Sequence, residues 1–264
     1  MNAVYIESVG IYGPGLVGWQ QARAALAGET PYAPTPPPPL KPERLAPDVR
    51  RRTTEHIRLA VEVATEATQS LGDDTKLLPT IFASAESDGA ITHDICVEVA
   101  KEKPQVSPTR FHNSVNNAPA GYWCMAVGSQ APSTSVAGYD GTFAIGLLEA
   151  WLQLTEAPRV LLVAHDTPFP EPLNSVRPLA VTFGAALVLT RERSPRSLAR
   201  LALTLTAEQK ETTLTDNHLE NMRRSNPAAQ ALPLLAALAR QQSGDVHLRY
   251  LDGRGLTARI EPLT

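Results

Sequence analysis

The stretch from residue 107 to residue 150 constrains the fold most, because it predicts a helix start, an apolar helix, a strand and a tight turn into another apolar helix in succession. Residues 134–137 favour a short buried strand, and the turn at 138–141 leads into an apolar helix over 142–150. Residues 160–163 are four consecutive large apolar side chains, which is typical of a strand covered on both faces of a parallel sheet. The chain is therefore expected to adopt an α/β layered fold.

Strands and helices alternate over most of the remaining chain, which agrees with that fold class. β-Branched residues and loose alternation predict strands at 3–11, 78–85, 182–189 and 198–205. Apolar residues at helical spacing predict helices at 19–27, 50–71 and 91–101. The polar residues from 207 to 226 predict an exposed crossing, after which Asn226 can cap a helix. A hairpin with its turn at 252–255 closes the chain.

The segment from residue 30 to residue 56 is unusual in composition. Residues 30–47 are rich in proline and predict a surface crossing in polyproline II conformation. Arg50, Arg51 and Arg52 follow it, at the expected start of a helix. They could form a solvated basic cluster, or they could meet an acidic partner. His56 falls among the polar positions of that helix, and its place suggests no function.

Composition excludes some classes of function. The chain has 264 residues and a net charge of −3, so it lacks the basic field of a nucleic-acid-binding protein. No stretch approaches the roughly eighteen apolar residues that a membrane span needs. Cys96 and Cys124 lie in apolar helical surroundings and predict buried free thiols in a reducing compartment. A cytoplasmic location follows from these observations.

The turn at 138–141 has the pattern of a nucleophile elbow, in which a strand and a helix present one side chain at the helix N-terminus. The expected tip is Gly138, between Ala137 and Tyr139. None of these residues is a plausible nucleophile at neutral pH. The sequence therefore predicts an elbow that lacks the group needed for covalent catalysis.

Three segments resemble the β-ketoacyl synthase family of the thiolase-like fold, and within it the short chain-length factors of aryl-polyene biosynthesis. They are SPTRFHNSVNN at 107–117, GYW at 121–123 and FAIG at 143–146. The resemblance implies a single domain over 1–264. Residues 1–205 would match the N-terminal half of a ketosynthase, and 206–264 would be a degenerate crossing, helix and hairpin. Active members carry a cysteine at the elbow, where this chain has Gly138.

The resemblance also implies a function without bond-making. The chain would form a heterodimer with a catalytic ketosynthase and shape its acyl tunnel, meeting an acyl carrier protein only indirectly. A helix over 109–123 would lie beside that tunnel. No cofactor and no metal are implied. The residues expected to line the tunnel or interface are Phe111, Asn113, Ser114, Val115 and Asn117.

Two other classes of function remain open from the sequence. A stand-alone enzyme could act on acyl thioesters, either as a hydrolase or as a decarboxylase in which Asn116 and Asn117 hold an enolate. The hydrolase would use Ser135, His165 and Asp166, although adjacent residues at a strand end usually face opposite sides. A homo-oligomeric scaffold is the third class.

A polar cluster follows the strand predicted at 78–85. It contains Glu86, Asp88, His93 and Asp94. His93 and Asp94 are adjacent and diverge on a helix, so this spacing favours ordinary surface polarity over a metal site. Thr92 and Asp94 could cap the helix.

Overall fold

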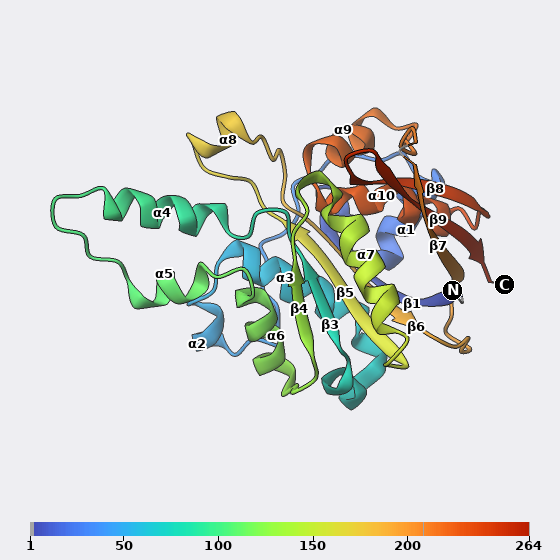
Figure 1. Cartoon of the computed structure of the whole chain (residues 1–264), viewed down its shortest axis with the longest axis horizontal. Coiled ribbons are helices and arrows are strands. Elements are labelled where there is room, and N and C mark those ends of the chain that lie inside the picture. Colours follow the sequence, from blue (N-terminus) through green and yellow to red (C-terminus); the bar gives the residue numbers. More distant parts are fainter. Residues whose placement is uncertain (1–2, 208, 264) are drawn as a thin grey trace.

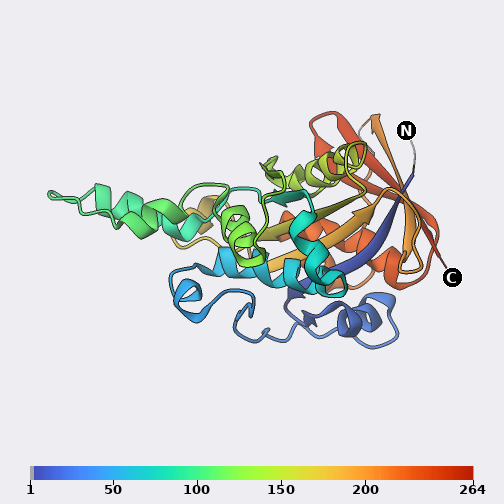
Figure 2. The same cartoon turned by 90° about the horizontal axis from the view of Figure 1, so that it is seen from below.

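The computed structural model describes residues 3–207 and 209–263, and it contains one mixed nine-stranded sheet with helices on both faces (Figures 1 and 2). The strand order is β4-β3-β5-β6-β1-β7-β9-β8, and the short β2 pairs with β1. The expected α/β layered fold is confirmed. The strands are β1 Val4–Gly13, β2 Leu16–Val17, β3 Thr80–Ala83, β4 Ser133–Val136, β5 Arg159–Asp166, β6 Phe183–Thr190, β7 Ala199–Ala207, β8 Gly244–Leu251 and β9 Arg254–Pro262. The α-helices are α1 Trp19–Ala27, α2 Pro47–Arg50, α3 Glu55–Ala67, α4 Gly89–Val99, α5 Pro108–Asn113, α6 Ala118–Val127, α7 Thr142–Gln153, α8 Leu173–Val176, α9 Asn217–Ser225 and α10 Leu232–Ala239, and the 3₁₀ turns are η1 Gln69–Leu77, η2 Tyr139–Gly141 and η3 Ala228–Ala231.

Strand β5 lies inside the sheet, as its apolar run predicts. It pairs in parallel with β3 and antiparallel with β6, so the sheet is mixed at this strand. Alternate side chains of β5 enter different cores. Leu162 packs in the core that contains α1, α7 and α10, whereas Leu161 and Val163 pack in the core that contains α3 and α6. Both faces of β5 are therefore covered, which explains why the run is continuously apolar.

The helix predicted over 50–71 is shorter than expected. It begins at Glu55, because Thr54 caps it by accepting a hydrogen bond from the backbone N–H of Ile57. Arg50 ends the separate helix α2, and Arg51 and Arg52 lie in the exposed turn between the two helices. The arginines therefore do not occupy the N-terminus of α3.

The prediction of a single helix over 109–123 is wrong, because two helices occupy that region. Helix α5 ends at Asn113, and the hydroxyl of Ser114 donates to the Phe111 carbonyl (2.8 Å). Helix α6 starts at Ala118 and ends before Gly128, which adopts the left-handed conformation. The residues between them form a turn, so the predicted interface lies on a helix end and a turn.

Strand β4 was expected to be buried, and this expectation is wrong. Among the strands that the structure describes it pairs only with β3, and it forms one edge of the sheet, where Ser133 is exposed and the next three residues are partly exposed. A local sequence pattern does not record which side of a strand is covered.

The C-terminal segment completes the sheet. Strand β9 pairs with β7, and the β8–β9 hairpin forms with Gly253 in a positive-φ turn, as predicted. Asn226 accepts hydrogen bonds from the backbone N–H groups of Ala228 and Ala229, which confirms its capping role. The polar crossing contains an unexpected helix, α9, capped by Asp216.

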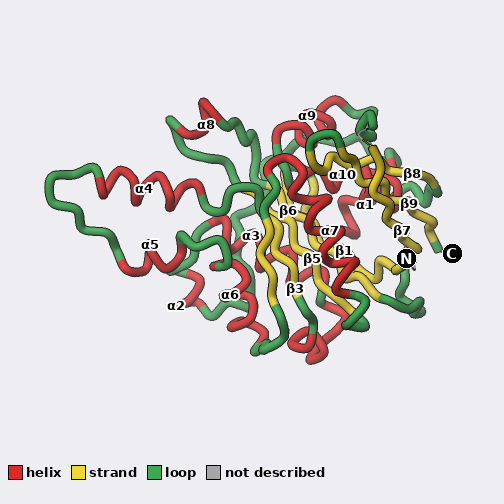
Figure 3. The backbone as a smooth tube through the Cα atoms, in the orientation of Figure 1, coloured by secondary structure: helices red, strands yellow, loops and turns green. Residues whose placement is uncertain are grey.

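Helices α4 and α5 form an arm that projects from the sheet, as Figures 1 and 3 show. Cys96 on this arm is exposed and Cys124 is partly buried, so the prediction of two buried thiols is wrong. Among the residues described, no helix is long and apolar enough to cross a membrane.

Candidate functional site

The predicted elbow is present between β4 and α7. The backbone N–H of Gly138 donates to the Thr142 hydroxyl (2.9 Å), and that hydroxyl donates to the Tyr139 carbonyl (2.6 Å). Tyr139 adopts the left-handed conformation with φ of 52°, which is uncommon for a residue with a side chain. The strained residue of the elbow is therefore Tyr139, next to the predicted tip.

The space at Gly138 is filled by the helix that follows. A Cβ built on Gly138 would lie 1.9 Å from Cδ1 of Ile145, so any larger residue requires the Ile145 side chain to move. Both cysteines of the chain lie on other helices, α4 and α6. The elbow therefore has the backbone of a nucleophile site without a nucleophile at its expected tip.

Arg177, from the loop after β5, covers the elbow. Its guanidinium lies 3.6 Å from the centroid of the Tyr139 ring and pairs with Asp140 (2.7 Å) and with Glu86. Burial alone would lower the pKa of Arg177, but the bonds to Asp140 and Glu86 raise it. Arg249 on β8 also pairs with Asp140 (2.7 Å). These contacts join the elbow to the ends of β3, β5 and β8.

A cavity of about 580 Å³ separates the elbow from the C-terminal hairpin. The hairpin approaches closely at one point, since a Cβ built on Gly141 would lie 1.9 Å from the Tyr250 carbonyl oxygen. Asp140 and Glu211 face this cavity and are both paired with Arg249. Two of the carboxylates that line the cavity are therefore already paired with an arginine.

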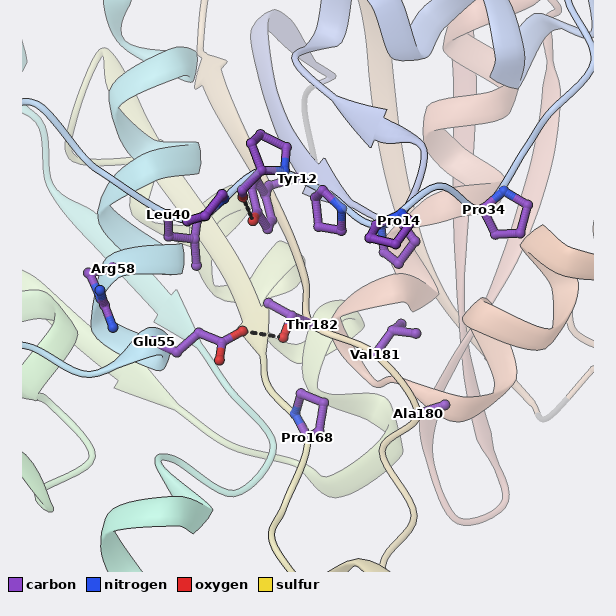
Figure 4. A pocket seen from close by; sticks show the side chains of 14 residues that line it. Tyr12, Pro14, Pro34, Leu40, Glu55, Arg58, Pro168, Ala180, Val181 and Thr182 are labelled. Atoms are coloured by element: carbon purple, nitrogen blue, oxygen red, sulfur yellow. Dashed lines mark hydrogen bonds between the residues drawn. The ribbon is translucent and has the colours of Figure 1, made fainter.

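A second cavity, of about 640 Å³, lies beneath the proline-rich segment (Figure 4). Residues 34–40 form one wall, which confirms the predicted surface crossing, and the Tyr12 hydroxyl holds it by donating to the Pro38 carbonyl. Opposite, the Thr182 hydroxyl donates to the Glu55 carboxylate (2.6 Å). The predicted tunnel residues are not part of this lining.

The predicted tunnel residues lie on α5 and the following turn. Phe111 is 65% exposed and Val115 is 46% exposed, Asn117 is exposed, and Ser114 is partly exposed. These four residues lie at the surface, and their role in lining a tunnel or an interface stays a prediction.

Asn113 differs from the other predicted tunnel residues, because it is buried. Its amide nitrogen donates to the Arg52 carbonyl (2.8 Å), and its amide oxygen accepts from the Tyr122 hydroxyl (2.9 Å). It therefore ties α5 to α6 and to the arginine turn.

The asparagines of this region do not cap α6. Asn117 occupies the N-cap position without a side-chain hydrogen bond, and Asn116 accepts from the Ser87 hydroxyl (2.6 Å). Neither asparagine side chain therefore forms a cap at the α6 N-terminus among the residues described.

The hydrolase triad is not assembled. The Asp166 carboxylate accepts from the Ser84 hydroxyl (3.0 Å) and from the backbone N–H groups of Ala85 and Ala228 (2.9 and 3.0 Å). His165 and the Ser135 hydroxyl have no hydrogen-bond partner among the residues described. Burial raises the pKa of Asp166 to about 7, although the hydrogen bonds from Ala85, Ser84 and Ala228 act to lower it. Asp166 therefore holds the start of η3 against the ends of β3 and β5.

The polar cluster after β3 is dispersed. Glu86 pairs with Arg177, Asp94 pairs with Arg110 (3.1 Å), and Asp88 caps α4 by accepting from the N–H of Ile91. The cap is thus neither Thr92 nor Asp94. Within residues 3–207 and 209–263, no group of three or more histidine, cysteine, aspartate or glutamate side chains could hold a metal ion.

Sequence reasoning missed Arg177 and His56. Arg177 lies in a segment that predicts only a loop, and its partners come from distant parts of the chain. His56 was placed among polar positions, but it is buried against His165. Neither contact leaves a signal in the local sequence.

Solved structures share this fold over nearly the whole chain. A ketosynthase (ApeO) in complex with its chain length factor (ApeC) from Xenorhabdus doucetiae matches with a TM-score of 0.75 and 19% identity, covering 98% of this chain and 100% of that one. The ishigamide ketosynthase/chain length factor matches with a TM-score of 0.75 and 13% identity, covering 100% of both chains. A β-ketoacyl synthase from Burkholderia phymatum STM815 matches with a TM-score of 0.70 and 10% identity, again over 100% of both chains. The TM-scores show a shared fold, and at these identities the likeness extends to the fold alone.

Sequence comparison gives the family. No curated protein matches the chain. The family model described as "Beta-ketoacyl synthase, N-terminal domain" matches residues 19–250, which is most of the chain. The fold, the elbow and this match agree, and the chain belongs to the β-ketoacyl synthase family through its N-terminal domain.

Proposed function

We propose that the chain is a chain-length factor that pairs with a catalytic ketosynthase and shapes its acyl tunnel without forming bonds itself. The observation that carries this proposal is an intact elbow with glycine at its expected tip and Ile145 in the space beside it. An elbow kept without a nucleophile suits a subunit that needs the shape of a ketosynthase but not its chemistry. Two similar structures contain a ketosynthase together with a chain length factor, which agrees with this role.

The open edge of the sheet supports a partner on the β4 side. Strand β4 pairs only with β3, and the described residues supply no backbone partner for its outer side. The opposite edge strand, β8, is partly covered, because Thr212 exchanges hydrogen bonds with the backbone of His247 (both 2.9 Å). An open edge is a ready site for pairing with another strand, so we propose that the partner pairs at β4.

Exposed apolar side chains on the arm and on α6 also support a partner. Phe111 and Val115 are joined by Val97, Val99 and Met125, all of which are exposed. Large apolar groups exposed to solvent favour an interface on the elements that carry them. The predicted tunnel or interface residues belong to this region, with Asn113 holding it in place.

The proposal has a finer form. The complex is a heterodimer of the aryl-polyene type in the cytoplasm, and it makes polyene or fatty-acid-like chains. An acyl carrier protein delivers substrate to the ketosynthase and reaches this chain only indirectly. Residues 1–264 act as one domain.

Replacing Phe111 with alanine is expected to lengthen the products of the complex, because bulk at this position shortens the partner's tunnel. Products of the co-purified complex are measured by mass spectrometry. Leu205→Ala on β7 is the matched control, since Leu205 is also exposed but lies far along the sheet from β4. An unchanged product distribution from an intact Phe111→Ala complex would count against a role in chain length.

A further inference from the structure

Two histidines are stacked between α3 and the central sheet. His56 lies in the first turn of α3, and His165 lies near the end of β5. Their ring centroids are 4.5 Å apart, with planes at 41°, and Phe82 packs edge-on against His165 at 6.0 Å. The two residues are 2% and 1% exposed. This contact joins the N-terminal turn of α3 to the interior of the sheet.

The ring nitrogens of the pair are unsatisfied. None of the four makes a hydrogen bond of normal geometry to any residue that the structure describes. Buried polar side chains usually have such partners, because an unpaired group loses its contact with water. A protonated ring here would carry a positive charge without an acceptor, directly beside a second ring that can also become positive. The geometry therefore favours two neutral rings.

The pKa values agree with this geometry. Burial lowers the pKa of His56 to about 4. Burial, and then the charge of His56, place the pKa of His165 well below its usual range, and the nearby Val163 carbonyl only weakly opposes this. The other titratable groups on α3 and on the elements packed against it are Glu55, Arg58, Glu62, Glu66, Tyr5, Glu7, Tyr12, Asp73, Asp74, Lys76, Tyr122, Cys124, Arg159 and Asp166. None of these groups is a cause of either histidine shift.

We propose that the His56–His165 stack is an acid-sensitive joint, which holds the first turn of α3 on the sheet while both rings are neutral and releases it when either ring is protonated. Glu55 and Arg58, in the same part of α3, line the cavity beneath the proline-rich segment (Figure 4). Release of this turn therefore opens that cavity. The joint does not depend on the proposed function.

The direction of the pH effect follows from linkage. Because the folded pKa of His56 is about 4 and the unfolded value is 6.5, its stabilisation is complete above pH 6.5 and is lost as the pH falls toward 4. That loss reaches about 300-fold in the folding equilibrium for His56 alone. Asp166 acts in the opposite sense, since its folded pKa is raised to about 7 and acidification from neutral pH favours its folded form. The test must separate these two effects.

The test compares variants of the full chain by urea unfolding between pH 7 and pH 4.5. In an Asp166→Asn background, which removes the opposing group with the largest shift, the folding equilibrium of the parent is expected to fall below pH 6.5; Glu62 and Glu66, whose pKa values burial also raises, remain the same in every variant compared. Adding His56→Leu and His165→Leu is expected to reduce that fall by about 100-fold or more. His112→Leu, at an exposed position on α5, is the matched control and is expected to leave the fall unchanged. An equal fall with and without the stacked pair would overturn the proposal.

A second measurement uses the unmodified chain and covers the case in which a variant fails to fold. The chain has six histidines, so six ring signals can be followed by NMR. Two are expected to stay neutral down to pH 5, and the protection of amides in the first turn of α3, relative to their intrinsic exchange rates, is expected to fall below that pH before protection elsewhere. Six signals that all titrate above pH 6 with unchanged protection in α3 would contradict the joint.

Discussion

Replacing Gly10 with valine is expected to prevent stable folding. Gly10 lies on β1 where α3 crosses it, and a Cβ at this position would lie 2.1 Å from the Val63 carbonyl oxygen and 3.0 Å from the Ala67 nitrogen. Both atoms belong to the backbone of α3, so the helix as a whole has to move. Because α3 also packs on β5, β6 and α6, we expect a loss of more than about 3 kcal/mol in the free energy of unfolding.

Urea unfolding followed by circular dichroism measures this loss. Gly244→Val is the matched control, since Gly244 also lies in a strand and an added Cβ there meets nothing within 4 Å. The control is expected to remain close to the parent in stability. A Gly10→Val chain as stable as the control would show that the close approach of α3 to β1 is not needed for the fold.

Replacing Ser135 with proline is expected to weaken association with a ketosynthase by about 100-fold or more while leaving the fold intact. The Pro132 and Val136 carbonyls accept hydrogen bonds from Thr80 and Ser84. Groups alternate along a parallel ladder, so the backbone N–H of Ser135 points away from β3. Proline removes this outward donor and adds bulk at the open edge, where pairing with a partner strand is proposed.

Calorimetric titration of the ketosynthase measures this association. Ser135→Thr is the control, because it keeps the backbone N–H and is expected to bind like the parent. Circular dichroism and a melting curve establish that Ser135→Pro remains folded. Unchanged affinity of a folded Ser135→Pro chain would place the partner away from the β4 edge.

The elements that sequence predicts well are those whose residues carry a local physical signal. The apolar run of β5 requires cover on both faces, and the structure provides it. Gly28 ends α1 in the left-handed conformation, as a C-terminal glycine should. Asn226 caps the next helical turn, and Gly253 turns the final hairpin. Each of these depends on neighbours within a few residues.

The predictions that fail depend on distant contacts. The edge position of β4 is set by which strands pair with β3, and the exposure of Cys96 is set by an arm that leaves the sheet. The break between α5 and α6 separates two helices whose relative positions Asn113 fixes by long-range hydrogen bonds. Likewise, Arg177 meets the elbow only after the sheet has formed. Local periodicity contains no information about such partners.

The most direct test of the proposed function is co-expression with a catalytic ketosynthase from the same organism, followed by size-exclusion chromatography with light scattering. A one-to-one complex is predicted, and its condensation activity should require this chain. A chain that elutes alone and turns over acyl thioesters without the ketosynthase would contradict the proposal and would indicate an enzyme in its own right.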